Sequence, residues 1–294
     1  MDVQKAKQIV RAFDRKSKPS DEDIFMATEA LSFLISELKD PKDMLYLGGI
    51  YYEMKEFDLA RKYYEMSAEY DFEPAHACLG YIYYYGRTGD PDYEKAFLHF
   101  EKSAEQGNLQ SAYKVADMYK NGYYVPKDYA KYVQIIEELW PKVEDAQYTE
   151  EPFPEVATRL AAIRAKQGKT EEAIDLYLRA KSFLEQRIQY HPFFGNFSIM
   201  KWLVRDLYEL MPLDEDNMDF YDLYEVLKNP CTVTFYFKNK PYDVVSEIEG
   251  DTPVISFDGK YYRDIDDFMQ QGTIGDEAIS SRAHQFYYFE VKRD

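Results

Sequence analysis

The sequence contains little of what a metal centre or a disulfide framework needs. Its 294 residues include two cysteines, Cys78 and Cys231, and four histidines. The cysteines fall in different regions, and no two histidines have the spacing of four residues that places two metal ligands on one helical face. No histidine stands beside a nucleophile with a supporting acid. We therefore expect no disulfide, no metal, no cofactor and no catalytic residue.

Positive charge is also scarce. The chain has 36 Lys and Arg against 54 Asp and Glu, a formal net charge of −18. Contact with phosphates requires clusters of Lys and Arg that this sequence lacks, so we expect no nucleic-acid partner. Such a charge would attract a basic protein partner, or it would only keep the exposed helix faces soluble.

Long apolar segments are absent as well. No stretch approaches 18 consecutive apolar residues, and residues 1–7 lack the apolar core of a secretory signal. We therefore expect a cytoplasmic protein without membrane contact. A composition of 46% hydrophobic and 17% aromatic residues predicts a folded chain.

The chain does contain an internal repeat. The apolar pattern of residues 79–83 recurs at 115–119, and that of 96–103 recurs at 132–139, with a constant offset of 36 residues. A period of this length is typical of stacked helical hairpins, which usually present a surface to another macromolecule.

Two further copies, at 47–67 and 160–180, have a turn that is four residues shorter. In each copy, small residues such as Gly48 and Gly80 leave room on the first helix for the second. A Tyr or Phe is expected to fill the remaining space.

The most specific segments of the repeats are Ala75 to Tyr83, Asp92 to Ala96, Lys102 to Asn108, and Asn121 to Tyr129. In these segments the chain resembles the tetratricopeptide superfamily, and the inner copies resemble its Sel-type (SLR) subclass. The resemblance extends from about residue 44 to 180. It implies a superhelical solenoid of antiparallel helix pairs that binds a protein or peptide on its concave face.

The predicted fold is mainly α, with a helical repeat solenoid over 1–228 and a small α+β module over 229–294. Beyond the repeats, helices are expected over 3–13, 197–210 and 219–227, and Ser20 with Asp23 predicts a helix that ends at Leu38. Prolines and carboxylates predict a loop over 141–154.

The sequence changes character after Asn229-Pro230. Strands are expected over 231–237, 254–257, 260–262 and 286–291, and a short helix over 264–271. Asp258-Gly259 predicts a hairpin turn between the second and third of these strands. The module is too aromatic to bury its side chains alone, so we expect it to pack on the last helices.

The repeats contain more tyrosines than their core pattern uses. By resemblance, the inner groove is lined by first-helix residues at fixed offsets from the small position. Those offsets select Tyr52, Glu53, Tyr81, Tyr84, Tyr85, Tyr113, Asp117, Lys120 and Asn121. Tyrosine suits such a surface because it offers a large area and a hydroxyl at a low entropic cost.

These observations favour a non-catalytic scaffold or adaptor that binds a partner through the concave face of the repeats. Two alternatives remain open. The first is a neutralising protein, like an immunity protein or antitoxin, that binds a basic toxin or nuclease. The second is an enzyme in the C-terminal module, which would require polar residues there to converge: Asp258, Arg263, Asp264, Asp266 and His284. The identity of the partner and the oligomeric state stay open.

Overall fold

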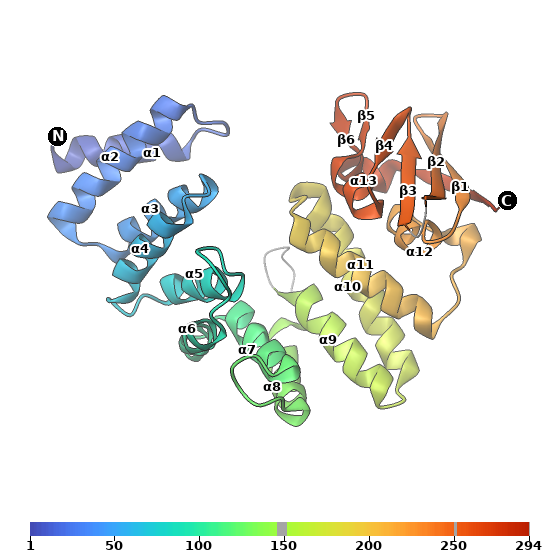
Figure 1. Cartoon of the computed structure of the whole chain (residues 1–294), viewed down its shortest axis with the longest axis horizontal. Helices are drawn as coiled ribbons and strands as arrows, with labels where there is room; N and C mark the ends of the chain where they lie inside the picture. The colour runs from blue at the N-terminus through green and yellow to red at the C-terminus, as the bar shows by residue number, and fades with distance from the viewer. Residues whose placement is uncertain (146–151, 250–251, 294) are drawn as a thin grey trace. The chain divides into compact units, whose positions relative to one another are not determined.

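The computed structural model describes residues 1–145, 152–249 and 252–293. The chain is mainly helical, with a solenoid of antiparallel helix pairs and a small C-terminal antiparallel sheet (Figure 1). It forms two compact units, Met1–Ile135 and Ile136–Asp294. Helix α8 (Tyr129–Val143) belongs to both units. The expected division at residue 228 stays a prediction.

The first unit is a run of helices that pack on their neighbours in chain order. Its complete helices are α1 (Val3–Asp14), α2 (Asp21–Leu38), α3 (Pro41–Glu53), α4 (Phe57–Ala68), α5 (Glu73–Tyr84), α6 (Tyr93–Glu105) and α7 (Leu109–Asn121). Helices α3 with α4 and α5 with α6 form the repeat hairpins, and α4 with α5 and α6 with α7 join successive hairpins. The predicted stack of helix pairs is therefore confirmed in this unit.

Helix starts in this unit follow local capping rules. The hydroxyl of Ser20 accepts a hydrogen bond from the backbone N–H of Asp23, and the Asp23 carboxylate accepts one from the backbone N–H of Ser20. Together they satisfy two backbone donors at the start of α2. The expected helix to Leu38 is confirmed.

Small residues set the distance between paired helices, as predicted. A β-carbon on Gly48 would lie 2.6 Å from the ring of Tyr64 on α4. In the next pair, Phe100 on α6 packs against Gly80 on α5 in the same way. The rings of Tyr64 and Phe100 are both buried. Helix pairs this close bury the aromatic side chains that lie between them.

The second unit begins with helices that continue the helical region. They are α9 (Phe153–Lys166), α10 (Thr170–Tyr190), α11 (Phe194–Leu210), the 3-10 turns η1 (Glu215–Asn217) and η2 (Phe220–Asp222), and α12 (Leu223–Val226). Helix α9 packs on α10, and α10 packs on α11.

Two expectations for this region were wrong in part. The loop predicted from Pro141 begins later, because α8 continues through Pro141 to the buried Val143. A proline in a last helical turn costs one hydrogen bond, and burial of the next apolar residue offsets that loss. The helix predicted over 219–227 is instead η2 followed by α12, because carboxylates cap a separate 3-10 turn first. Residues 146–151 of the predicted loop lie outside the described residues.

The C-terminal region forms a five-stranded antiparallel sheet in the order β4-β3-β2-β1-β7. Its elements are β1 (Cys231–Phe237), β2 (Lys240–Glu249), β3 (Thr252–Phe257), β4 (Lys260–Tyr262), α13 (Ile265–Gln271), β5 (Thr273–Ile274), β6 (Glu277–Ala278), α14 (Ile279–Arg282), η3 (Ala283–Gln285) and β7 (Tyr287–Lys292). Strands β5 and β6 pair separately. In β1 every second side chain is buried, the pattern of a sheet with one covered face.

The hairpin predicted at Asp258-Gly259 is confirmed, with Phe257 paired to Lys260. Both turn residues have positive φ, at 49° and 74°, as a type I′ turn requires. Strand β2 was missed. Its turn from β1, Lys238-Asn239, also has two positive φ values, but it contains no glycine that would signal a hairpin.

The covered face of the sheet packs on helical residues of the same unit. Phe220 of η2 is 1% exposed and contacts the rings of Phe235, Phe268 and Phe286, with centroid distances of 6.3, 6.1 and 5.3 Å. Lys201 on α11 forms an ion pair with Asp266 on α13, and Figure 1 shows these two helices side by side. The expected packing of the module on the last helices is confirmed.

Candidate functional site

Four tyrosine rings from two helices of the first unit surround the ammonium group of Lys114. The Nζ atom lies 5.6, 5.2, 5.6 and 5.5 Å from the ring centroids of Tyr81, Tyr84, Tyr85 and Tyr113. It also donates a hydrogen bond of 3.4 Å to the Tyr85 hydroxyl. Cations within about 6 Å of an aromatic face are attracted by the ring quadrupole. We call these four tyrosines with Lys114 the tyrosine cluster.

The helical period explains why three of these rings meet. Tyr81, Tyr84 and Tyr85 stand at the end of α5 with spacings of three and four residues, so they share one side of the helix. The rings of Tyr81 and Tyr85 stack at 6.2 Å, and Tyr84 meets Tyr85 edge-on at 5.1 Å. Contacts of this kind hold the rings in fixed orientations.

The cluster presents both buried and exposed rings. Tyr85 exposes 46% of its surface, Tyr81 and Tyr84 are half-buried, and Tyr113 on α7 exposes only 7%. Tyr85 is therefore the most accessible ring of the cluster, and Tyr113 supports Lys114 from below the surface.

A chain of ring and cation contacts connects this cluster to Tyr52. The Tyr52 ring meets Phe57 edge-on at 5.2 Å. The Arg87 guanidinium lies over both Phe57 and Tyr85, at 5.7 and 5.3 Å. Tyr52 on α3 thus joins the same surface through two residues that the sequence analysis did not select.

The other predicted residues lie along α3 and α7. Glu53 is exposed at the end of α3, and Asn121 is exposed at the end of α7. Burial, and next the charge of Asp117, raise the pKa of Tyr84. The Lys120 ammonium lies 5.3 Å from the ring centroid of Tyr132.

Sequence reasoning missed Lys114, Arg87 and Phe57. Lys114 directly follows the selected Tyr113, but its role depends on contacts with a helix 30 residues earlier in the chain. No local spacing signals such a contact, because it depends on how α5 and α7 pack.

The histidines were expected to stand alone, and this was wrong for two of them. His76 and His99 meet with 3.0 Å between their Nδ1 atoms, and His99 stacks on Tyr83 at 5.7 Å. Burial, and then the charge of His76, lower the pKa of His99 to about 4. Within the described residues, no group of three or more His, Cys, Asp or Glu is placed to hold a metal ion.

The polar residues considered for a C-terminal enzyme have separate structural roles. Asp264 caps α13, Arg263 pairs with Asp264 at 3.1 Å, and Asp266 pairs with Lys201. Asp258 is exposed in a hairpin turn. His284 lines a small cavity that the other four residues do not line.

Asp214 and Asp219 cap the two 3-10 turns, which explains the carboxylates of that region. Burial raises the pKa of the Cys78 thiol to about 11, the behaviour of an inert thiol. No helix among the described residues is long and apolar enough to cross a membrane.

The repeat pattern, the helix pairs and the small residues between them decide the kind of repeat. A family model for the Sel1 repeat matches residues 44–69, 74–108 and 109–131. The chain carries Sel1 repeats. These repeats contain the whole tyrosine cluster, and each matched segment contributes residues to the wider surface that includes Tyr52.

Solved structures with the same kind of fold include c5321 from uropathogenic Escherichia coli, a protective antigen with an SLR fold. It is 20% identical, with a TM-score of 0.51, over 71% of this chain and 49% of that one. A Sel1 repeat protein from Oxalobacter formigenes is 20% identical, with a TM-score of 0.48, over 74% and 96% of the two chains. No curated protein matches the sequence.

Proposed function

We propose that this protein is a non-catalytic scaffold that binds a protein or peptide through the surface around the tyrosine cluster. The Sel1-repeat fold is typical of protein-protein interaction scaffolds. The observation that carries the proposal is the set of four tyrosine rings around Lys114.

Rings that are already fixed suit a binding surface. A partner pays less conformational entropy when the anchors it meets are held in place before binding. Lys114 and Arg87 both lie over the ring of Tyr85, yet this ring is still 46% exposed. Tyr85 and Tyr52 would make first contact, with Tyr81 and Tyr84 forming the wall behind them.

The charged residues of this surface would set the rate of association. Glu53 and Asp117 would attract a basic segment, and Lys120 would help to orient it. Charges at the edge of an interface act mainly on association and salt dependence, whereas aromatic anchors act mainly on dissociation.

The test is site-specific photocrosslinking in cells that make the protein. A photoreactive phenylalanine analogue replaces Tyr52 or Tyr85, and the matched control carries it at Leu98, which is 50% exposed on α6. The same crosslinked protein should appear from Tyr52 and Tyr85 and be absent from Leu98.

Affinity measurements with that partner complete the test. Tyr81→Ala and Tyr84→Ala should each accelerate dissociation about tenfold or more with unchanged circular dichroism. Charge reversal at Asp117 should mainly slow association at low salt. If both tyrosine variants bind like the parent while changes at Leu98 abolish binding, the partner uses the second-helix face instead.

A neutralising protein for a basic toxin is the second candidate, favoured by the net charge of −18. In that case the captured partner would be a basic enzyme whose activity falls on binding. An adaptor would leave its partner active.

A further inference from the structure

The ammonium group of Lys114 is held by ring faces and not by carboxylates. Its Nζ lies over the rings of four tyrosines, and its hydrogen bond to the Tyr85 hydroxyl is long, at 3.4 Å. Ordinary N–H···O bonds span about 2.7–3.2 Å. Within residues 1–145, 152–249 and 252–293, no carboxylate forms an ion pair with this nitrogen. That arrangement needs an explanation in a chain whose net charge is −18.

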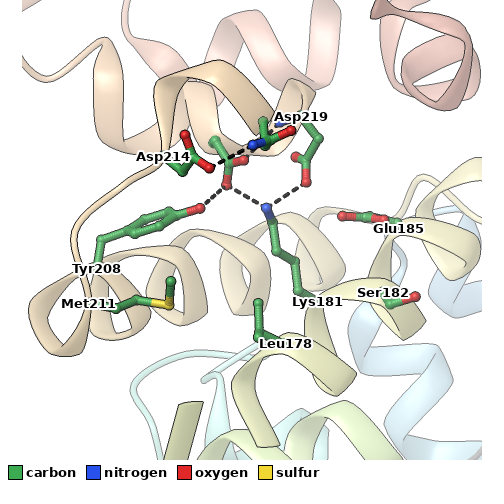
Figure 2. Close-up of a pocket in the computed structure, with 10 residues that line it drawn as sticks. Leu178, Lys181, Ser182, Glu185, Tyr208, Met211, Asp214 and Asp219 are labelled. Carbon is green, nitrogen blue, oxygen red and sulfur yellow. Dashed lines mark hydrogen bonds and ion pairs between the residues drawn. The ribbon is translucent and has the colours of Figure 1, made fainter. Parts of the chain in front are cut away.

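Lys181 in the second unit shows the usual way to hold a lysine. It is 6% exposed, and its Nζ lies 2.6 Å from an Asp219 carboxylate oxygen and also donates to Asp222 (Figure 2). Methyl groups on that nitrogen would replace the N–H donors of both ion pairs. The Lys114 ammonium also has three donors, but within the described residues only the long bond to Tyr85 uses one of them. Two of its N–H groups can therefore be replaced without the loss of a hydrogen bond inside the protein.

The Lys114 nitrogen also stands too far from the rings for direct contact. Its distances to the four ring centroids lie between 5.2 and 5.6 Å. Atoms in van der Waals contact are about 3.5–4.0 Å apart. A methyl carbon bonded to the nitrogen, at about 1.45 Å, would place the nitrogen about 5.0–5.5 Å from a ring that the carbon touches. The four rings are thus spaced for a methylated nitrogen, whereas a bare ammonium leaves a gap.

Methylation would keep the attraction between the nitrogen and the rings. A methylated lysine keeps its positive charge, and cages of aromatic rings are a known way to bind such a group. The cluster has rings from two helices, α5 and α7, and Tyr81 and Tyr85 are already stacked on each other. The rings are therefore in place before any methyl group arrives.

We propose that Lys114 is a methylation site, and that its dimethylated form fills the tyrosine cluster. The two methyl groups occupy the space between the nitrogen and the rings, and the remaining N–H continues to donate to the Tyr85 hydroxyl. This proposal concerns the cluster itself, goes beyond partner binding and needs no partner for its test.

The reaction requires a methyl donor of the sulfonium class and a lysine methyltransferase. In each step the Lys114 ammonium first loses a proton, and its lone pair attacks the methyl carbon of the sulfonium. The N–C bond forms as the S–C bond breaks, and the electrons of the broken bond stay on sulfur, which leaves as a neutral thioether. Each step thus replaces one N–H by one N–CH3 and releases one proton. Two steps give a dimethylammonium with the original charge.

The side chain of Lys114 can reach such an enzyme. The residue is half-buried, and its nitrogen is held by one long hydrogen bond and by ring faces. Its flexible four-carbon stem can turn away from the rings without breaking an ion pair. After methylation, the more complete contact with the rings would favour its return to the cluster.

The first experiment is mass spectrometry of the full chain isolated from the cells that make it naturally. The peptide that contains Lys114 should carry two methyl groups, and the peptide that contains the exposed Lys18 should carry none. Lys114 found only in its unmethylated form would overturn the proposal.

The second experiment tests whether a methylated nitrogen fits. In a background of Cys78→Ala and Cys231→Ala, Lys114→Cys is alkylated to give the dimethyl-lysine analogue, the unmethylated lysine analogue, or an S-3-methylbutyl group as the neutral isostere. The dimethyl form should have the highest Tm, by about 2 °C or more over each of the others. The same three groups at Lys18→Cys should give equal Tm values. Equal values at position 114, or the highest value with the neutral isostere, would overturn the proposal.

A spectroscopic measurement shows where the methyl groups lie. With carbon-13 in the methyl groups, the ring currents of the tyrosines should shift their NMR signals upfield at position 114 and leave them unshifted at position 18. Tyr84→Leu should reduce the shift. Signals at position 114 that match those at position 18 would place the methyl groups in solvent and overturn the proposal. Since no partner is present in these measurements, their failure would leave the proposed partner binding untouched, and the crosslinking experiment tests that separately.

Discussion

Phe100 occupies the space that a side chain on Gly80 would need. A β-carbon on Gly80 would lie 2.4 Å from Cδ1 of Phe100, a separation that real β-carbons essentially never show. The distance between α5 and α6 therefore depends on a missing methyl group. The same relationship between Gly48 and Tyr64 sets the distance between α3 and α4.

Gly80→Ala is accordingly expected to destabilise the first unit by about 2 kcal/mol through overpacking. Gly49→Ala is the matched control, because its new β-carbon would have only the Tyr64 hydroxyl within reach, at 4.0 Å. That control should be neutral or up to about 1 kcal/mol more stable, since alanine favours a helix more than glycine does. Urea unfolding followed by circular dichroism distinguishes the two, and equal midpoints would contradict this packing.

Removing the cation of the tyrosine cluster should loosen its rings. Lys114→Met keeps most of the side-chain volume but loses the charge that four tyrosine rings face. We expect a loss of about 1 kcal/mol in the free energy of unfolding. In a double-mutant cycle with Tyr84→Leu, a coupling energy of about 0.5 kcal/mol or more should appear. If the effects of Lys114→Met and Tyr84→Leu were additive, Lys114 would not hold the rings. The control is the exposed Lys18→Met, whose effect should be additive with that of Tyr84→Leu.

The pair formed by His76 and His99 predicts a loss of stability in acid. The pKa of His99 is about 4 in the folded protein, below its ordinary value of 6.5. Unfolded chains therefore bind a proton between these values that the folded chain does not, so stability falls as the pH decreases from about 6.5 to about 4. Thermal unfolding across this pH range should show a decrease in the free energy of unfolding. In His99→Gln this decrease should be smaller by about 1–2 kcal/mol. A pH profile for His99→Gln identical to that of the parent would contradict this prediction.

Phe220 should anchor the sheet to the helices of the second unit. Phe220→Ala removes a ring that contacts three other phenylalanines and is expected to cost about 3–5 kcal/mol. Trp202→Ala, at a residue that is 57% exposed on α11, should cost less than about 1 kcal/mol. Chemical denaturation measures both, and similar losses for the two variants would contradict the anchoring role.

The sequence predicted the repeat fold because each hairpin follows local rules. Periodic apolar positions, small residues and caps such as Ser20 act within a few residues of one another. Strand β2 could not be recognised because its apolar residues do not alternate regularly with polar ones, and its turn, Lys238-Asn239, lacks the usual glycine. The continuation of α8 through Pro141 depends on burial of Val143, which no local pattern reveals.

For the candidate site, the sequence identified rings but not the cations between them. The selected Tyr81, Tyr84, Tyr85 and Tyr113 all come together around Lys114, because helical spacing and the repeat period place them on the first helices of successive repeats. Lys114 and Arg87 were missed, since a cation above a ring depends on interhelical distances.

The two edges of the C-terminal sheet also bear on whether this acidic, aromatic chain can associate through its strands. Edge strand β4 has only three residues. The opposite edge, β7, is irregular where Tyr288 adopts a φ of 53°, and it carries exposed Glu290 and Lys292. Short, bulged and charged edges are poor templates for another strand. Association by strand addition is thus disfavoured here, and crowded solutions of the protein should resist fibril formation.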